Sequence, residues 1–463
     1  MWLRNPLAML AEGPHETYAG GLTVEDGRIV ELVAAGGVPL LWRADEYEVF
    51  DASDHVVLPG LINTHHHFYQ TLTRAMPAAM NRDLFPWLQA LYPIWAGLDA
   101  EMIAASTRIA LAELLLSGCT TASDHHYVFS DVLQDAIDIE VEAATELGIR
   151  VHLTRGSMSL SVDDGGLPPA SVVQDHDTIM TESVRLADAY HQSGTGAMVQ
   201  IALAPCSPFS VTRELMLDTA ELARARGLRL HTHLAETEDE NSFCCEKFGA
   251  RPLDYAESLG WIGSDVWFAH GIHFNDAEVA RLGAAGTGVA HCPSSNMVLS
   301  SGICPVAKLE ASGAPVGLGV DGSASNDGSN MIAEVRQAML LQKLAQGAGA
   351  VDHIRALNWA TRGSAACLGR DDLGRIEVGS VADLALFRLD GPQFSGAGDP
   401  LAALVLCGAT CADAVMVGGV WRVMDGAIIG FDLDAAIHSH GAAARRLWGR
   451  ADTSFFGTEA LRF

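Results

Sequence analysis

Short runs of apolar residues recur along the middle of the chain. Most of these runs end in a polar or small residue and lead into a helix-like pattern. Eight of them occur, at residues 56–64, 118–126, 149–155, 198–206, 228–236, 266–270, 287–292 and 314–321. Helical patterns lie between them, as at residues 101–116 and 211–226. Eight strand–helix units over about 310 residues predict an α/β fold, a (β/α)8 TIM-like barrel with insertions.

An open, doubly wound sheet is the alternative architecture. It would place a glycine-rich phosphate loop after the first strand. The first run instead leads into three consecutive histidines, His65, His66 and His67. We therefore favour the barrel, in which chemistry takes place at the C-terminal ends of the strands.

The two ends of the chain show strand and hairpin patterns. Alternating residues flank the turn Asp26-Gly27 near the start, and a similar pattern flanks Asp425-Gly426 near the end. We expect the two ends to pair into one small domain. The predicted boundaries are 1–57 together with 378–430 for a composite β-sandwich, 58–377 for the metal-dependent barrel, and 431–463 for a C-terminal helical segment and tail.

The charge balance narrows the choice of partners. The chain has 463 residues with 29 Lys and Arg against 57 Asp and Glu, a formal net charge of −28. Nucleic acids and anionic membranes attract clustered basic residues, so neither is expected as a partner. We find neither a signal-peptide pattern nor an apolar run of membrane-spanning length, and a cytoplasmic location is expected.

Histidine and aspartate at the predicted strand ends suggest a metal site. Residues two apart on a strand share a face, so His65 and His67 can reach one ion while His66 points away. His233 ends the fifth run and Asp321 ends the eighth. Three imidazoles and one carboxylate suit Zn²⁺, with Fe²⁺ possible. His231 shares the face of His233 one layer deeper, where we expect a buried, hydrogen-bonded histidine.

The scarcity of lysine favours a single metal ion. Barrel hydrolases with two bridged metals often use a carboxylated lysine on a strand between the first histidine pair and the next histidine. The first lysine of this chain is Lys247, which lies beyond His233. A glutamate bridge is not strictly excluded by this count, but the fourth run ends in Pro205-Cys206. A mononuclear site is the simpler prediction.

Three residues at these strand ends suit hydrolytic displacement at an amidine-like carbon. A zinc ion lowers the pKa of its bound water to roughly 7. Asp321 could orient that water and accept its proton, and Glu236 could protonate a ring nitrogen and later the leaving group. His270 could polarise the reacting centre. The other zinc deaminase architecture requires H-x-E and P-C-x-x-C, and position 209 is phenylalanine rather than the second cysteine.

At these residues the chain resembles the amidohydrolase superfamily, in the branch that contains aminohydrolases and chlorohydrolases. The matching motifs are residues 59–67, 233–236, 269–270 and 320–326, and the resemblance spans nearly the whole chain. It implies one zinc held by His65, His67, His233 and Asp321, with Glu236, His270 and Asp321 catalytic. Members of this superfamily are commonly oligomeric, so a homo-oligomer is possible.

Further stretches resemble deaminases of an oxidised purine within this branch, at residues 65–74, 123–127, 156–160, 165–169 and 291–296. The resemblance implies the conversion of 8-oxoguanine and water into urate and ammonia. Isocytosine, cytosine, guanine, isoxanthopterin and a hydroxy-triazine are alternative substrates, and dechlorination of a chlorotriazine is an alternative reaction. A metal-binding barrel without catalysis is a third class.

The residues around the motifs suit a small, flat, polar heterocyclic base. A glutamine amide can read a lactam edge, aromatic rings can form flat walls, and arginine can face a ring oxygen. The expected substrate-binding residues are Gln70, Trp87, His125, Tyr127 and Arg155. A structural salt bridge is the alternative for Arg155, and loop packing for Trp87. The second run ends His125-His126, and one of the two is expected to face the pocket.

Overall fold

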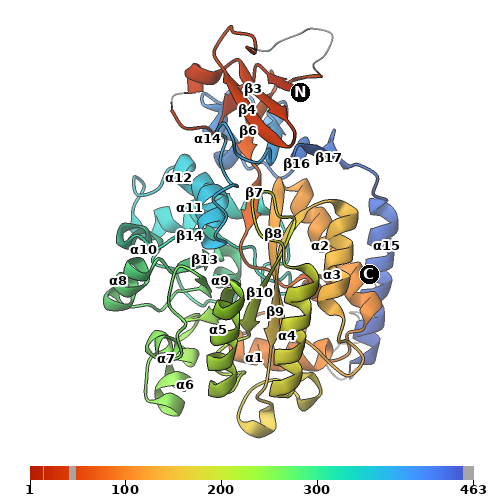
Figure 1. Cartoon of the computed structure of the whole chain (residues 1–463), viewed down its shortest axis with the longest axis vertical. Coiled ribbons are helices and arrows are strands. Elements are labelled where there is room, and N and C mark those ends of the chain that lie inside the picture. The colour runs from red at the N-terminus through yellow and green to blue at the C-terminus, as the bar shows by residue number, and fades with distance from the viewer. Residues whose placement is uncertain (14, 41–47, 452–463) are drawn as a thin grey trace.

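The computed structural model describes residues 1–13, 15–40 and 48–451 of the chain. Part of the predicted C-terminal tail, residues 452–463, lies outside the described residues. The described chain forms a barrel surrounded by helices, with a smaller β region at one end (Figure 1). Among these described residues, no helix is long and apolar enough to cross a membrane.

Eight parallel strands form the barrel and follow one another in chain order. They are β7 (Leu61–Asn63), β8 (Cys119–His126), β9 (Arg150–Ser157), β10 (Val199–Pro205), β11 (Arg229–Leu234), β12 (Val266–His270), β13 (Gly288–His291) and β14 (Val316–Leu318). Backbone hydrogen bonds join the first strand to the last, from Thr64 N to Leu318 O at 2.9 Å and from Asp321 N to His65 O at 3.0 Å. The predicted barrel is confirmed, and its closure brings the His65 and Asp321 segments together.

Helices cover the outside of the barrel. They are α2 (Ala100–Leu116), α3 (Ala136–Leu147), α4 (His176–Tyr190), α5 (Arg213–Arg226), α6 (Glu238–Phe248), α7 (Pro252–Ser258), α8 (Asp276–Ala285), α9 (Pro293–Val298), α10 (Val306–Ser312), α11 (Met331–Gln346), α12 (His353–Asn358), η5 (Trp359–Gly363) and α13 (Ser364–Cys367). Helix α5 illustrates the local signals, because the Thr212 side chain accepts a hydrogen bond from Leu215 N at its start. It ends at Gly227, whose φ of +67° suits glycine.

The C-terminal ends of the barrel strands carry additional segments. These are η2 (Phe68–Thr73) and α1 (Leu84–Trp95), which follow β7, and η3 (Val162–Asp164) and η4 (Ala170–Val172), which follow β9. Helix α1 lies at this end of the barrel, opposite the small β region (Figure 1). It therefore stands where the predicted chemistry is placed.

Two sheets built from both ends of the chain form the small β region. One has the order β4 (Arg28–Val33), β3 (Gly21–Glu25), β1 (Trp2–Arg4) and β5 (Val49–Asp51). The other has the order β18 (Ala427–Ile428), β17 (Val420–Met424), β16 (Ala414–Val417), β15 (Leu384–Arg388), β6 (His55–Pro59) and β2 (Ala8–Met9). Strand β15 pairs antiparallel with β6, and a common core joins the two sheets. The predicted β-sandwich from both termini is confirmed.

The first apolar run is divided between two sheets. Residues 55–59 form β6 of the small β region, and residues 61–63 form β7 of the barrel. Gly60 separates the two strands, and a Cβ atom there would lie 2.1 Å from the Thr120 Oγ1 atom. The chain can therefore pass between the two cores only without a side chain at this position.

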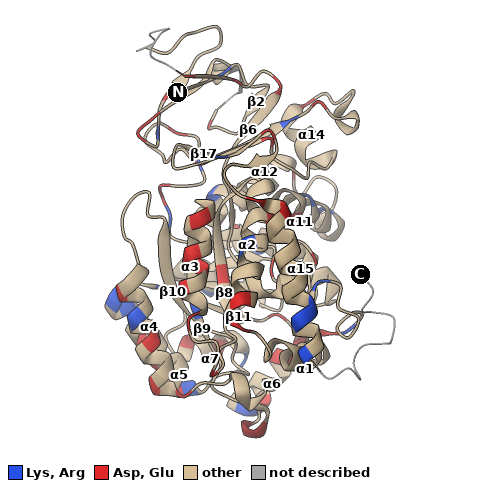
Figure 2. Cartoon of the chain, turned by 90° about the vertical axis from the view of Figure 1, so that its right-hand side faces the viewer, with Lys and Arg blue, Asp and Glu red and all other residues tan. Residues whose placement is uncertain are grey.

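The remaining elements lie at the edges of these two parts. They are η1 (His15–Tyr18), η6 (Pro392–Phe394), α14 (Pro400–Leu406) and α15 (Leu433–Arg450). Helix α15 runs back along the barrel beside α2 (Figure 1). In the view of Figure 2, Lys and Arg are scattered among acidic residues, and acidic residues lie on α3 and α6. In this view no single face collects the basic side chains.

Candidate active site

Four side chains from three strand ends converge at the mouth of the barrel. The Oδ1 atom of Asp321 lies 3.4 Å from Nε2 of His65 and 3.3 Å from Nε2 of His67. The Nε2 atoms of His67 and His233 are 3.2 Å apart. His66 points away and its Nε2 atom lies 2.9 Å from the Ser329 hydroxyl, as expected from alternation along a strand.

These donor atoms fit a small divalent cation. A tetrahedral ion with ligand bonds of about 2.0–2.1 Å holds its ligand atoms about 3.3–3.4 Å apart. The separations among the four side chains match this spacing. The Nε2 atom of His65 is buried and has no hydrogen-bond partner among the described residues. A bound ion would supply the missing partner.

The tautomer of His65 is fixed from deeper in the barrel. His231 is fully buried, as expected, and its Nδ1–H donates to the Trp267 carbonyl at 2.8 Å. The Nε2 atom of His231 therefore accepts a hydrogen bond from Nδ1 of His65, at 2.8 Å. The Nε2 lone pair of His65 is thus left facing the other donors.

Backbone carbonyls fix the other two imidazoles in the same way. Nδ1 of His67 donates to the carbonyl of His125 at 2.7 Å, and Nδ1 of His233 donates to the carbonyl of Cys206 at 2.6 Å. Both rings therefore direct an Nε2 lone pair into the same space, where the two Nε2 atoms lie 3.2 Å apart. Outer hydrogen bonds of this kind orient metal-binding histidines.

The charge states also suit a cation. Burial lowers the pKa of His65 well below its ordinary value and lowers that of His233 to about 3, so both rings are neutral. Burial alone would raise the pKa of Asp321, but the adjacent imidazoles of His65 and His67 hold it well below the usual range. The centre therefore combines neutral imidazoles with an ionised carboxylate.

Glu236 and His270 lie beside this centre. The Nε2 atom of His270 is 3.5 Å from Oε2 of Glu236 and 3.9 Å from Oδ2 of Asp321. Nδ1 of His270 lies 3.0 Å from Oδ1 of Asn296, which fixes the ring. Burial, together with the charge of Asp321, raises the pKa of Glu236 well above its ordinary value. A protonated Glu236 can donate a proton in this site.

The backbone is strained where these side chains leave the strands. Ala235, His270 and Asp321 have φ angles of +54°, +71° and +63°, in the left-handed region that residues with a Cβ seldom adopt. Such conformations cost on the order of 1–3 kcal/mol each and cluster at functional sites. Three of them therefore surround the one centre.

A pocket opens above the centre. Its floor is polar and its walls are mainly apolar, as in sites for small molecules. The lining residues are His67, Gln70, Leu84, Trp87, Leu88, Tyr92, Tyr127, Cys206, Phe209, His233, Glu236, His270, Leu299, Asp321 and Ser325. Three of the five expected substrate-binding residues, Gln70, Trp87 and Tyr127, are among them.

These three residues are held differently. Gln70 is only 1% exposed, and neither atom of its amide group has a hydrogen-bond partner among the described residues. Trp87 Nε1 donates to the Ala324 carbonyl at 3.2 Å, which fixes its ring. The ring of Tyr127 meets that of His67 at a centroid distance of 5.1 Å. Gln70 is therefore the group that needs a partner from a ligand or water.

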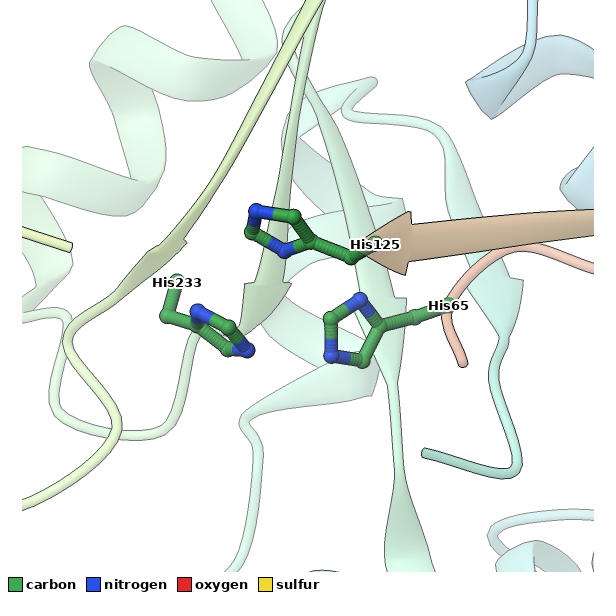
Figure 3. Close-up of side chains that lie close together, drawn as sticks. All are labelled: His65, His125 and His233. Carbon is green, nitrogen blue, oxygen red and sulfur yellow. The ribbon is translucent and has the colours of Figure 1, made fainter. Parts of the chain in front are cut away.

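The other two expected residues do not line the pocket. His125 lies beside His65 and His233, and the three rings form a triangle (Figure 3) with centroid distances of 4.8 to 5.8 Å. Its Nε2 atom donates to the Ala204 carbonyl at 2.9 Å, whereas His126 is directed to the Val128 carbonyl. Of the pair, His125 is the histidine on the side of the metal centre.

Arg155 lies behind the pocket wall. Its guanidinium donates to the carbonyl of Gly156 and, at 2.6 Å, to the side chain of Gln174. It also stacks over the ring of Phe129 at 4.1 Å. These contacts are typical of a structural arginine. They do not indicate that Arg155 contacts a ring oxygen of a bound base.

The sequence interpretation missed the contribution of α1 to the pocket. Leu84, Leu88 and Tyr92 line it from that helix, together with Trp87. Their spacing of three and four residues predicts one helical face. This spacing predicts an amphipathic helix. It does not predict that the apolar face of the helix forms a wall of the pocket.

Comparison with known proteins finds relatives that match nearly the whole chain. The chain is 61% identical to the 8-oxoguanine deaminase of Pseudomonas aeruginosa, over 96% of this chain and 98% of that protein. It is 38% identical to an isoxanthopterin deaminase of an unknown prokaryotic organism, over 86% of each chain. The atrazine chlorohydrolase TrzN of Arthrobacter aurescens TC1, solved in complex with zinc, has a TM-score of 0.89 and 31% identity, over 96% of this chain and 99% of that chain.

A family model described as the amidohydrolase family matches residues 56–422. This range includes the whole barrel and both strands β6 and β15 that pair in the small β region. The predicted resemblance is confirmed, and the chain belongs to the amidohydrolase family.

Proposed function

We propose that this protein is a metal-dependent hydrolytic deaminase that converts 8-oxoguanine and water into urate and ammonia. The 61% identity to an 8-oxoguanine deaminase, which extends over 96% of the chain, is the observation that carries the proposal. The arrangement of Glu236, His270 and Asp321 in the lining of one pocket supports it.

The proposed cofactor is one Zn²⁺, with Fe²⁺ as the alternative ion. His65, His67, His233 and Asp321 would hold it, because their donor atoms have the spacing and charge states described above. When bound, zinc supplies a water molecule whose pKa is lowered to roughly 7. The first lysine of the chain is Lys247, so the bridging lysine of many two-metal barrels has no counterpart before His233.

The proposed chemistry at the base needs two proton carriers. As oxygen bonds to the ring carbon that bears the amino group, Asp321 accepts a proton from water and Glu236 donates one to the adjacent ring nitrogen. Asp321 then passes its proton to the amino group as the carbon–nitrogen bond breaks. Glu236 takes back the hydroxyl proton as the new carbonyl forms, which leaves urate and ammonia. His270, which lies beside Glu236 and Asp321, polarises the reacting centre.

The base is proposed to lie between apolar walls with its polar edge toward Gln70. Trp87 and Tyr127 would contact its faces, because both line the pocket. His125 and Arg155 would act from behind the lining, His125 next to the imidazoles and Arg155 through Gln174. A cytoplasmic location and a homo-oligomeric state remain predictions of the sequence.

A panel assay tests this proposal. Zinc-loaded protein is incubated with 8-oxoguanine, guanine, isocytosine, cytosine, isoxanthopterin and hydroxy-triazines, and ammonia is measured. We expect the highest kcat/KM on 8-oxoguanine, with urate as the product. Chloride release from chlorotriazines tests dechlorination, the alternative reaction. This alternative is included because the fold is similar to that of an atrazine chlorohydrolase. Inactivity on 8-oxoguanine with high activity on another compound overturns the substrate assignment.

A further inference from the structure

We propose that Glu240 is a positioning residue that aims Glu236 into the pocket. Glu240 does not line the pocket, and it lies in the first turn of α6, just after the segment that carries Glu236. The inference rests on the proposed function in one respect, because it takes Glu236 as the proton carrier of the reaction.

The side chain of Glu240 binds the turn at two successive amides. Its Oε1 atom accepts a hydrogen bond from Ala235 N at 3.1 Å, and its Oε2 atom accepts one from Glu236 N at 2.8 Å. The residue is fully buried. A buried carboxylate without its hydrogen bonds is costly, so these two bonds fix its position as firmly as they fix the backbone.

The amides that Glu240 holds belong to the strained part of the turn. Ala235 has a φ of +54°, and its carbonyl accepts hydrogen bonds from Ile272 N and His273 N, both at 2.9 Å. The turn is therefore held on one side by Glu240 and on the other by the loop that follows His270. Release of either side would let Ala235 return to an ordinary conformation and would move the Glu236 side chain.

Ordinary capping of the helix does not account for this contact. Thr237 is the N-cap of α6, and in a capping box the glutamate at the third helical position bonds the amide of the N-cap residue itself. Glu278 does so at the same position of α8, where it accepts from Asn275 N at 2.7 Å and pairs with Arg251. Glu240 instead reaches past the N-cap to residues 235 and 236.

A matched pair of variants separates positioning from stability. Glu240→Gln keeps the size of the side chain but turns its amide NH₂ group toward one of the two backbone amides. We expect kcat to fall about 10- to 100-fold, with KM changed less than threefold and metal content unchanged. Glu278→Gln, which removes an equally buried glutamate at the same helical position, should lower Tm and leave kcat within about threefold.

A double-mutant cycle provides the decisive kinetic readout, because residues that act through one another are not additive. In the Glu236→Gln background, Glu240→Gln should reduce the residual rate less than threefold. A fall in the double mutant as large as in the single mutant would show a general structural role and would overturn the inference. So would a Glu240→Gln enzyme with kcat within threefold of the original.

A crystal structure of Glu240→Gln tests the inference without any substrate. We expect a changed φ at Ala235 and a displaced Glu236 carboxyl, and an unchanged turn would overturn the inference even if activity fell. The kinetic arms use whichever base of the panel the original protein deaminates best. If no base is deaminated, the proposed function fails while the structure of the variant still decides whether Glu240 holds the turn.

Discussion

Two sets of buried polar groups at opposite ends of the barrel differ in their hydrogen bonding. At the N-terminal end, Arg150 begins β9 and forms a buried ion pair with Asp383, which precedes β15 of the small β region, at 3.0 Å. At the C-terminal end, several buried polar atoms have no partner among the described residues. The contrast is between an ion pair that joins two structural parts and the polar atoms of the candidate active site.

The buried pair at the N-terminal end is fully hydrogen-bonded. Nη1 of Arg150 donates to the carbonyls of Gly196 and Ala197, both at 2.7 Å, and Oδ1 of Asp383 accepts from Gly418 N at 2.7 Å. The side chains of Arg150 and Asp383 are 0% and 2% exposed. Such satisfaction is what allows a charge pair to remain buried.

The C-terminal end keeps its polar atoms available. His65 Nε2, Glu236 Oε1 and both amide atoms of Gln70 are buried without partners among the described residues. Groups of this kind are rare in native proteins and need a reason, since each costs about 1–3 kcal/mol. The proposed metal ion and base would supply partners for these atoms, so we expect the unliganded protein to lose stability at this end.

Removal of the metal should have the largest effect on this contrast. Dialysis against a strong chelator should abolish ammonia release, a loss of at least about 10³-fold, because the water of lowered pKa is lost. Tm should also fall, since a ligand bound only to the folded state stabilises it. Added Zn²⁺ should restore both, and dialysis against buffer alone is the control. An apo-protein with full activity would contradict the metal assignment.

Glu236→Gln should come next, with a fall in kcat of roughly 10³-fold, because it removes a proton carrier. Metal content, measured by elemental analysis, should stay the same, since Glu236 is not among the four proposed ligands. Glu238→Gln is the control, a glutamate two residues away whose side chain is 71% exposed. Turnover retained by Glu236→Gln within tenfold would show that another group carries the proton.

Asp383→Asn tests the other end. It leaves the buried Arg150 without a counter-charge, and the free energy of unfolding should fall by about 3–5 kcal/mol. The kcat of the folded enzyme should not change, because the pair is remote from the pocket. Denaturant unfolding measures the effect. Asp51→Asn, which breaks the exposed pair with Arg4, should cost no more than about 1 kcal/mol. Equal losses in the free energy of unfolding of the two variants would show that the buried ion pair contributes no more to stability than the exposed one.

Among the changes at the candidate active site, Gln70→Leu should have the smallest effect on turnover. Loss of the amide that reads the base should lower kcat/KM for 8-oxoguanine by about 10- to 100-fold, which corresponds to about 1–3 kcal/mol. Tm should stay the same or rise, because an unpartnered buried amide is removed. A variant with unchanged kcat/KM would show that Gln70 does not contact the base. Leu88→Met, a change of similar volume in the same pocket, serves as the control.

Much of the active-site geometry was predictable because it depends on topology. Residues two apart on a strand share a face, and parallel strands in a barrel all end at the same rim. His65, His67, His233 and Asp321 therefore had to meet once the eight runs were recognised as barrel strands. Local patterning also predicted that the two ends of the chain pair into one small β region, but it assigned the residues of β6 to the first barrel strand.

Packing of distant segments was not predictable in the same way. The place of α1 over the pocket, the pairing of Arg155 with Gln174 and the position of His125 behind the lining depend on side chains far apart in the chain. Arginine and histidine can serve a ligand or a neighbour equally well. Their residue type alone does not distinguish these roles.

The sequence by itself determined the barrel, the four donor side chains and the neighbouring acid, because strand periodicity and chain order are local properties that impose a shared rim. Only the tertiary structure decided which of the remaining polar groups have partners. Glu240 acquires its role because α6 turns back on residues 235 and 236, and Gln70 remains unpartnered because no neighbour reaches it among the described residues. Hydrogen-bond satisfaction depends on positions to within a few tenths of an ångström, and packing alone sets distances that precisely.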